Sequence, residues 1–235
     1  MKALLPPILF VCISATCFGQ CNSFYPLKEN VRYEYDHFDR KEKLSLRMSQ
    51  TVRNITGSGT NMSATLFQEM FDPKKGDKIA SSEHVWKCED GTLHFDMKSM
   101  ALNMDNIQQM NMGEAGWSLD VTGDALDLPT DLQVGQTLKD VSYHIKMTMS
   151  GVNIMNRTFN VKERKVESQE SVTTPAGTFD CYKVTFITVS EGGIGSGTIK
   201  TAMWYAKDAG LIKAENYKED GKLIGRQVLA KLSKV

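Results

Sequence analysis

Apolar and polar residues alternate along most of the chain, and this period of two is typical of β-strands that bury one face. The alternation is regular in residues 31–36, where Val31, Tyr33 and Tyr35 are separated by polar side chains. Turn residues lie between such segments. Asp90-Gly91 is the strongest hairpin signal, because both central positions of that turn type favour a positive φ. The pattern predicts an antiparallel protein built mainly of β-strands.

The segment at residues 170–186 is predicted to form a complete hairpin. Val172 and Thr173 are β-branched strand formers, and Pro175 to Gly177 have the composition of a tight turn. The proline fixes φ at the first corner, while the glycine permits a positive φ at the next. The chain then resumes as a strand at residues 179–189.

Turn signals recur roughly every 8–12 residues, which is the spacing of an antiparallel sandwich or barrel. The predicted strands cover residues 31–36, 44–55, 62–71, 79–88, 92–96, 117–128, 141–149, 158–166, 172–189, 199–205, 211–217 and 223–232. We therefore expect an all-β fold with minor α content, in which about 11–12 strands form a single antiparallel, highly curved sheet or barrel. No linker divides residues 20–235, so one domain is expected there.

One stretch departs from the period of two. Met97, Met100, Met104 and Ile107 recur at helical spacing, with polar residues on the opposite side. Residues 97–111 are therefore predicted to form a short amphipathic helix that ends before the glycines at 113 and 116.

Residues 1–19 are predicted to be a secretory signal peptide. Lys2 supplies the positive n-region, residues 3–18 are mostly apolar, and Gly19 provides a small residue for cleavage. The alternative is a lipoprotein signal acylated at Cys21 or Cys17, although the residues before these cysteines, Gln20 and Thr16, are larger than such signals prefer. The mature protein is expected to be exported, without a transmembrane segment, and either periplasmic or secreted.

Cleavage after residue 19 would leave three cysteines, so one thiol remains outside any intramolecular disulfide. Cys21 and Cys88 are the expected pair. Cys181 is then expected to be a buried, inert thiol. No histidine lies within three residues of any of the three in sequence, which disfavours a catalytic thiol.

Composition and local motifs restrict the function further. The chain has 28 basic and 28 acidic residues, so it lacks the basic character of nucleic-acid-binding proteins. The glycine-rich loop at residues 192–197 lacks the Lys-Ser/Thr ending of a phosphate-binding loop. The histidines are scattered over separate predicted strands at positions 37, 84, 94 and 144. We therefore expect no enzymatic activity, no metal and no cofactor.

Two motifs carry a resemblance to a known family. The segment Val172-Thr-Thr-Pro-Ala-Gly-Thr-Phe-Asp-Cys-Tyr-Lys183 and the segment Trp204-Tyr-Ala-Lys-Asp-Ala-Gly-Leu-Ile-Lys213 are similar to those of uncharacterised exported proteins of Bacteroidota. That family is classified as a domain of unknown function, and some members as TapB-like. The resemblance spans nearly the whole mature chain. It implies an exported, largely antiparallel β protein that curls into an open or closed barrel. More distantly, it implies a similarity to the half-barrels that carry lipoproteins across the periplasm.

The leading functional hypothesis is non-enzymatic binding of a lipid or another hydrophobic ligand inside the curved sheet. Met97, Met100, Met104 and Ile107 would form a deformable apolar lid over that ligand. The same side chains could instead pack against the sheet in an envelope protein that has a structural role or binds another envelope protein. A third hypothesis is a Cu(I) site built from the thioethers.

Overall fold

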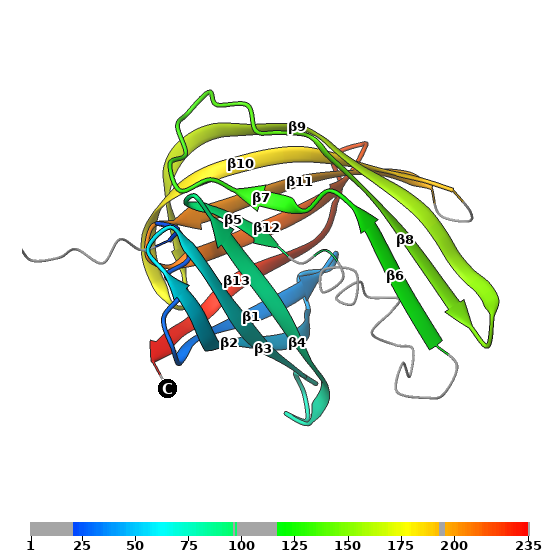
Figure 1. The fold of residues 1–235 in the computed structure, drawn as a ribbon, viewed down its shortest axis with the longest axis horizontal. Helices are drawn as coiled ribbons and strands as arrows, with labels where there is room; N and C mark the ends of the chain where they lie inside the picture. Colours follow the sequence, from blue (N-terminus) through cyan, green and yellow to red (C-terminus); the bar gives the residue numbers. More distant parts are fainter. Residues whose placement is uncertain (1–20, 96, 98–116, 193–195, 235) are drawn as a thin grey trace, which may run out of the picture.

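The computed structural model describes residues 21–95, 97, 117–192 and 196–234. In this part of the chain, thirteen strands form one antiparallel sheet (Figure 1) with the order β6-β8-β9-β10-β11-β12-β13-β1-β2-β3-β4-β5-β7. The strands are β1 (Val31–Asp39), β2 (Leu44–Ser58), β3 (Asn61–Phe71), β4 (Lys78–Glu89), β5 (Thr92–Phe95), β6 (Trp117–Gly123), β7 (Leu126–Leu128), β8 (Val141–Met149), β9 (Val152–Thr174), β10 (Gly177–Glu191), β11 (Gly197–Ala206), β12 (Gly210–Lys218) and β13 (Leu223–Lys234).

The predicted fold class is confirmed, with thirteen strands in place of the eleven or twelve expected. The sheet is strongly curved (Figure 1) and is not a closed barrel, because β6 and β7 are its two edge strands. These edges are nevertheless consecutive in the chain, with only Asp124 and Ala125 between them. Three Cα–Cα steps of about 3.8 Å hold Gly123 within ~11 Å of Leu126. The chain therefore links the two edges of the sheet covalently.

The prediction of a single strand at residues 117–128 was wrong, because β6 and β7 are separate strands. Gly123 has a φ of 113°, and a Cβ there would lie 2.5 Å from the carbonyl oxygen of Ser142. Asp124 then donates its N–H to the same oxygen at 2.8 Å, and its carboxylate accepts the Ser142 N–H at 3.1 Å. Pairing with β8 ends at this turn, and the chain crosses to pair with β5.

The predicted break between residues 166 and 172 was also wrong, because β9 runs without interruption from Val152 to Thr174. The polar run at 167–171 masked the alternation, yet residues 168–171 pair with β10. Two register shifts accommodate the irregular pattern, and Glu163 adopts a φ of 56° beside one of them. Such β-bulges bend a long strand and re-aim its side chains.

The hydrophobic core lies inside the curve of the sheet. Its fully buried side chains come from strands across the whole sheet and include Tyr33, Tyr35, Leu66, Leu93, Leu128, Ile145, Met147, Ile212 and Leu229. The predicted helix at 97–111 lies outside the described residues except for Met97, which is helical and buried. The predicted signal peptide also lies outside them.

The first described residues, 21–27, enter one end of this core, and we call them the N-terminal plug. Cys21 is joined to Cys88 by a disulfide, the pair that the sequence suggested, with the Cα atoms 6.1 Å apart. Asn22 is fully buried and donates its side-chain amide to the carbonyl oxygens of Gly91 and Leu128. These bonds fix the plug to β7 and to the turn between β4 and β5.

Aromatic side chains complete the plug. The ring of Tyr25 packs edge-on against Trp86, with centroids 4.9 Å apart, and contacts Tyr33 and Tyr205 as well. The hydroxyl oxygen of Tyr25 accepts the N–H of Leu211 at 3.0 Å. This end of the sheet, which we call the plug end, is therefore filled by the chain's own N-terminal segment.

Candidate functional site

The inward side chains of β6, β8 and β9 form an apolar surface that we call the apolar wall. On β8, the alternating pattern Val141, Tyr143, Ile145 and Met147 faces inward, and all four side chains are buried. Register pairing places Leu119 and Val121 of β6, and Met155 and Phe159 of β9, on the same face. Leu119, Val121 and Met155 are only half-buried. The wall thus keeps accessible apolar area on the inner side of the sheet.

The apolar wall extends away from the plug end. The last pair between β9 and β10 joins Thr158 to Glu191, so residues 152–157 of β9 run past β10. Six residues of β-strand span about 20 Å. Figure 1 shows β8, β9 and β6 projecting together beyond the rest of the sheet. We call this the distal end.

The other wall of the interior carries polar side chains that the sequence did not reveal as a group. On β2, β3 and β4, Gln50, Gln68 and Ser82 lie opposite one another in register. Gln50 donates its amide to the Oε1 of the fully buried Gln68 at 2.9 Å, and Ser82 Oγ lies 3.0 Å from Nε2 of buried His84. No local motif signals such a row, since it arises only from strand register.

Arg164 is a buried cation of this interior, with a side chain only 3% exposed. Its guanidinium donates to the carboxylate of Asp127 at 2.5 Å and to the backbone carbonyl of Asp127 at 2.6 Å. It also donates to the carbonyl of Lys139 at 2.5 Å. Asp127 belongs to the edge strand β7, which has a neighbouring strand on one side only. Arg164 therefore supplies a hydrogen-bond donor to a backbone carbonyl of this edge strand.

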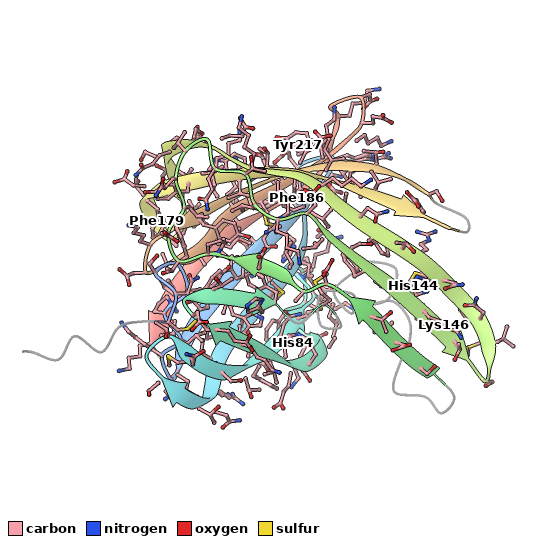
Figure 2. All side chains as sticks on the ribbon, turned by 45° about the horizontal axis from the view of Figure 1, so that its top comes forward. His84, His144, Lys146, Phe179, Phe186 and Tyr217 are labelled. Atoms are coloured by element: carbon pink, nitrogen blue, oxygen red, sulfur yellow. A yellow bond between two sulfur atoms is a disulfide. The ribbon has the colours of Figure 1, made fainter. Side chains whose placement is uncertain are left out.

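The β-bulge at Glu163 explains why Arg164 points inward. Thr185 and Ile187 of β10 pair with Lys165 and Lys162, so two residues of β9 lie opposite the single residue Phe186 (labelled in Figure 2). A bulge of this kind changes which face the following side chain occupies. Arg164 therefore reaches β7 across the interior.

The predicted ligand residues are only partly placed by the structure. Met97 is 8% exposed and packs within the core, and its Sδ accepts the N–H of Leu126 at 3.3 Å. Met100, Met104 and Ile107 lie outside the described residues. Met97 thus lies next to β7. The thioether lid and the thioether Cu(I) site stay predictions.

Cys181 is fully buried, as the sequence suggested. Burial, together with the nearby Asp180 and Glu170 carboxylates, raises the pKa of its thiol to about 12. The thiol is therefore protonated at neutral pH, and only a thiolate is an effective nucleophile or metal ligand.

The described part of the chain contains no group of three or more His, Cys, Asp or Glu side chains close enough to hold a metal ion. None of its helical segments combines the length and the apolar character needed to cross a membrane.

Comparison with known proteins places this arrangement among related folds. The sequence model of the DUF3108-like family matches residues 28–229. A predicted exported protein with a YmcC-like fold from Bacteroides fragilis has a TM-score of 0.73 and 21% identity, covering 91% of this chain and 100% of its own. A predicted lipoprotein from Parabacteroides distasonis has a TM-score of 0.73 and 23% identity, covering 91% and 99%. Among curated proteins, none matches this chain.

Proposed function

The chain belongs to the DUF3108-like family, and from this premise we propose that it is an exported envelope protein that binds a lipid or similar hydrophobic molecule against the apolar wall. The two structural neighbours, a predicted exported protein and a predicted lipoprotein, support an envelope location. The disulfide at Cys21 argues against acylation there, since the lipid of a lipoprotein would need the same sulfur.

The observation that carries the proposal is the accessible apolar area of the wall. Leu119 and Val121 project from the edge strand β6 toward the inner side of the sheet, where Tyr143 and Phe159 stack with ring centroids 5.2 Å apart. Apolar side chains left partly exposed on a concave surface favour binding of an apolar ligand.

The closed plug end supports the same function. Tyr25, Trp86 and Phe95 fill the interior there, with Trp86 and Phe95 centroids 5.1 Å apart. A hydrophobic molecule would therefore have to enter from the distal end, where the wall begins.

A matched pair of substitutions on β6 tests this proposal. Leu119→Glu places a charge on the inner side of the edge strand, whereas Thr122→Glu places the same charge on the exposed outer side. We expect the wild-type protein and Thr122→Glu to bind the fluorescent fatty acid cis-parinaric acid saturably. Leu119→Glu should bind at least about tenfold more weakly, because burying an unpaired carboxylate opposes binding.

Circular dichroism must first show that both variants keep the β spectrum. Equal affinity in the two variants, or no saturable binding by the wild-type protein, would contradict the proposal.

A second candidate function, a structural or interaction module without a small ligand, is favoured by the dense packing at the plug end. Phe24 of the plug and Leu93, which lies opposite Cys88, have no exposed area there. A wild-type protein that binds no hydrophobic probe would support this second function.

A further inference from the structure

The tip of the β8–β9 hairpin carries a cluster of exposed apolar side chains. Met149, Val152 and Ile154 are 41%, 62% and 42% exposed. Met149 lies directly opposite Val152 in the strand register, so the two side chains are neighbours on one face. Ser150 and Gly151 connect the strands with φ values of 48° and 80°, the geometry of a tight two-residue hairpin turn.

This placement is unusual for a hairpin that extends into solvent. Tips of exposed hairpins are normally polar, since the apolar residues gain nothing by folding there. Here three large apolar residues that the fold leaves exposed fall within six positions, 149–154. They also lie at the end of the segment that runs past β10.

The two charged residues of the hairpin that lie nearest its tip are both basic. The sequence holds no acidic residue between positions 147 and 156, while Lys146 and Arg157 stand at the base of the tip on β8 and β9. Figure 2 shows Lys146 on the projecting hairpin, nearer the tip than His144. The closest carboxylate in the strand register is Asp120 of β6, opposite Lys146.

We propose that this tip docks onto the surface of a phospholipid bilayer. The side chains of Met149, Val152 and Ile154 would enter the boundary between head groups and acyl chains. Lys146 and Arg157 lie three and four residue pairs behind the Met149–Val152 pair, and they would face the phosphates, because cations near apolar residues favour an anionic membrane surface.

A bilayer fits the tip better than a protein partner does. A stable protein interface buries roughly 800 Å² on each side, and three side chains on a two-residue turn offer far less. A bilayer needs no matching surface, and it accepts a few inserted side chains together with nearby positive charge. The inference does not depend on ligand binding at the apolar wall, although docking would bring that wall next to the membrane.

Vesicle flotation provides the test. The probe is a vesicle of phosphatidylcholine and phosphatidylglycerol, and the protein is the disulfide-bonded form, whose Cys21 sulfur carries no lipid. We expect wild-type protein to float with the vesicles and Val152→Asp/Ile154→Asp to show at least a tenfold lower bound-to-free ratio. Val134→Asp is the matched control, because Val134 is 57% exposed but lies in the loop that pairs with β9 far from the tip.

Three results would overturn the inference: no flotation of the wild-type protein, equal flotation of the tip variant, or an equal loss in Val134→Asp. Sedimentation velocity without vesicles addresses self-association, since a wild-type dimer that the tip substitutions dissociate would assign the tip to a second copy instead. Membrane docking by the tip and ligand binding at the apolar wall can be contradicted independently of each other. The tip variant should still bind cis-parinaric acid, and Leu119→Glu should still float.

Discussion

His37 places a titratable ring on the inner face of β1. It lies opposite Leu46 of β2 and Gln227 of β13, and its Nε2 is buried without a hydrogen-bond partner among the described residues. Burial lowers the pKa of the imidazole from 6.5 to about 4. The folded protein therefore holds this ring neutral at pH values where the unfolded chain would protonate it.

The free energy of unfolding should decrease as the pH falls from 7 to 5. Between pH 6.5 and about 4 the unfolded state binds more protons than the folded state, so acid favours unfolding. The decrease attributable to His37 should be about 1–2 kcal/mol, measured by urea denaturation at each pH. His37→Leu should lose most of this pH dependence. A variant whose stability falls as steeply as that of the wild type would contradict the assignment.

At the scale of an element, the N-terminal plug depends on one close approach. Gly210 begins β12 with a φ of 74°, and a Cβ at that position would lie 2.4 Å from the ring of Tyr25. That ring is held by Trp86 and Tyr33 and cannot easily move. Glycine is therefore required both for the backbone conformation and for the contact with the plug.

Gly210→Ala should destabilise the protein more than Gly221→Ala does. Both glycines have a positive φ, but a Cβ at Gly221 would meet no atom within 4 Å. The control should lose about 1–2 kcal/mol from backbone strain alone, and Gly210→Ala about 1–3 kcal/mol more from the clash. Urea denaturation of both variants measures the difference. Equal losses would mean that the plug does not pack tightly against this turn.

Local signals predicted much of the sheet, whereas long-range pairing decided the rest. Asp90 and Gly91 do have φ values of 49° and 80°, as their turn signal indicated. The division of residues 117–128 into two opposite edge strands could not be predicted, because alternation does not identify the strand that a segment pairs with. The polar run at 167–171 concealed part of β9 for the same reason.

The candidate site was predicted less well than the fold. Alternation indicated that residues 141–149 form a strand, but it did not show that Ile145 and Met147 would contribute to the inner surface of a projecting hairpin. The bulge that turns Arg164 inward gave no sequence signal either. The sequence instead predicted a ligand site at Met97, Met100, Met104 and Ile107, and of these residues the structure describes only Met97.

At the scale of the whole molecule, Arg164 and Asp127 hold the edge strand β7 against β9. The two side chains differ in burial, at 3% and 22% exposed. Removing Asp127 therefore leaves a buried guanidinium without its partner, whereas removing Arg164 leaves a carboxylate that is partly exposed to water. The cost of breaking a buried pair comes mainly from the charge that remains buried.

Asp127→Asn should therefore be more destabilising than Arg164→Met. The first leaves a buried guanidinium without its carboxylate and should cost about 3–5 kcal/mol. The second leaves a carboxylate that reaches water, so its cost should be smaller. The double variant should be more stable than Asp127→Asn alone, as measured by urea denaturation. If Arg164→Met is the more damaging change, the hydrogen bonds of Arg164 to backbone carbonyls matter more than its charge.

If the protein is exported as proposed, the position of the plug has a consequence for the order of folding. Translocation that starts from the N-terminus would deliver Asn22 and Tyr25 first, yet their contacts include Leu128 and Leu211, which follow much later. β1 likewise pairs with β13, the last of the described strands, so this pairing cannot form until β13 has been delivered. Contacts so distant in sequence form slowly and leave apolar strands uncovered in the meantime. The earliest residues to cross would thus be among the last to become ordered, and the emerging polypeptide would need protection from aggregation until its C-terminus is released.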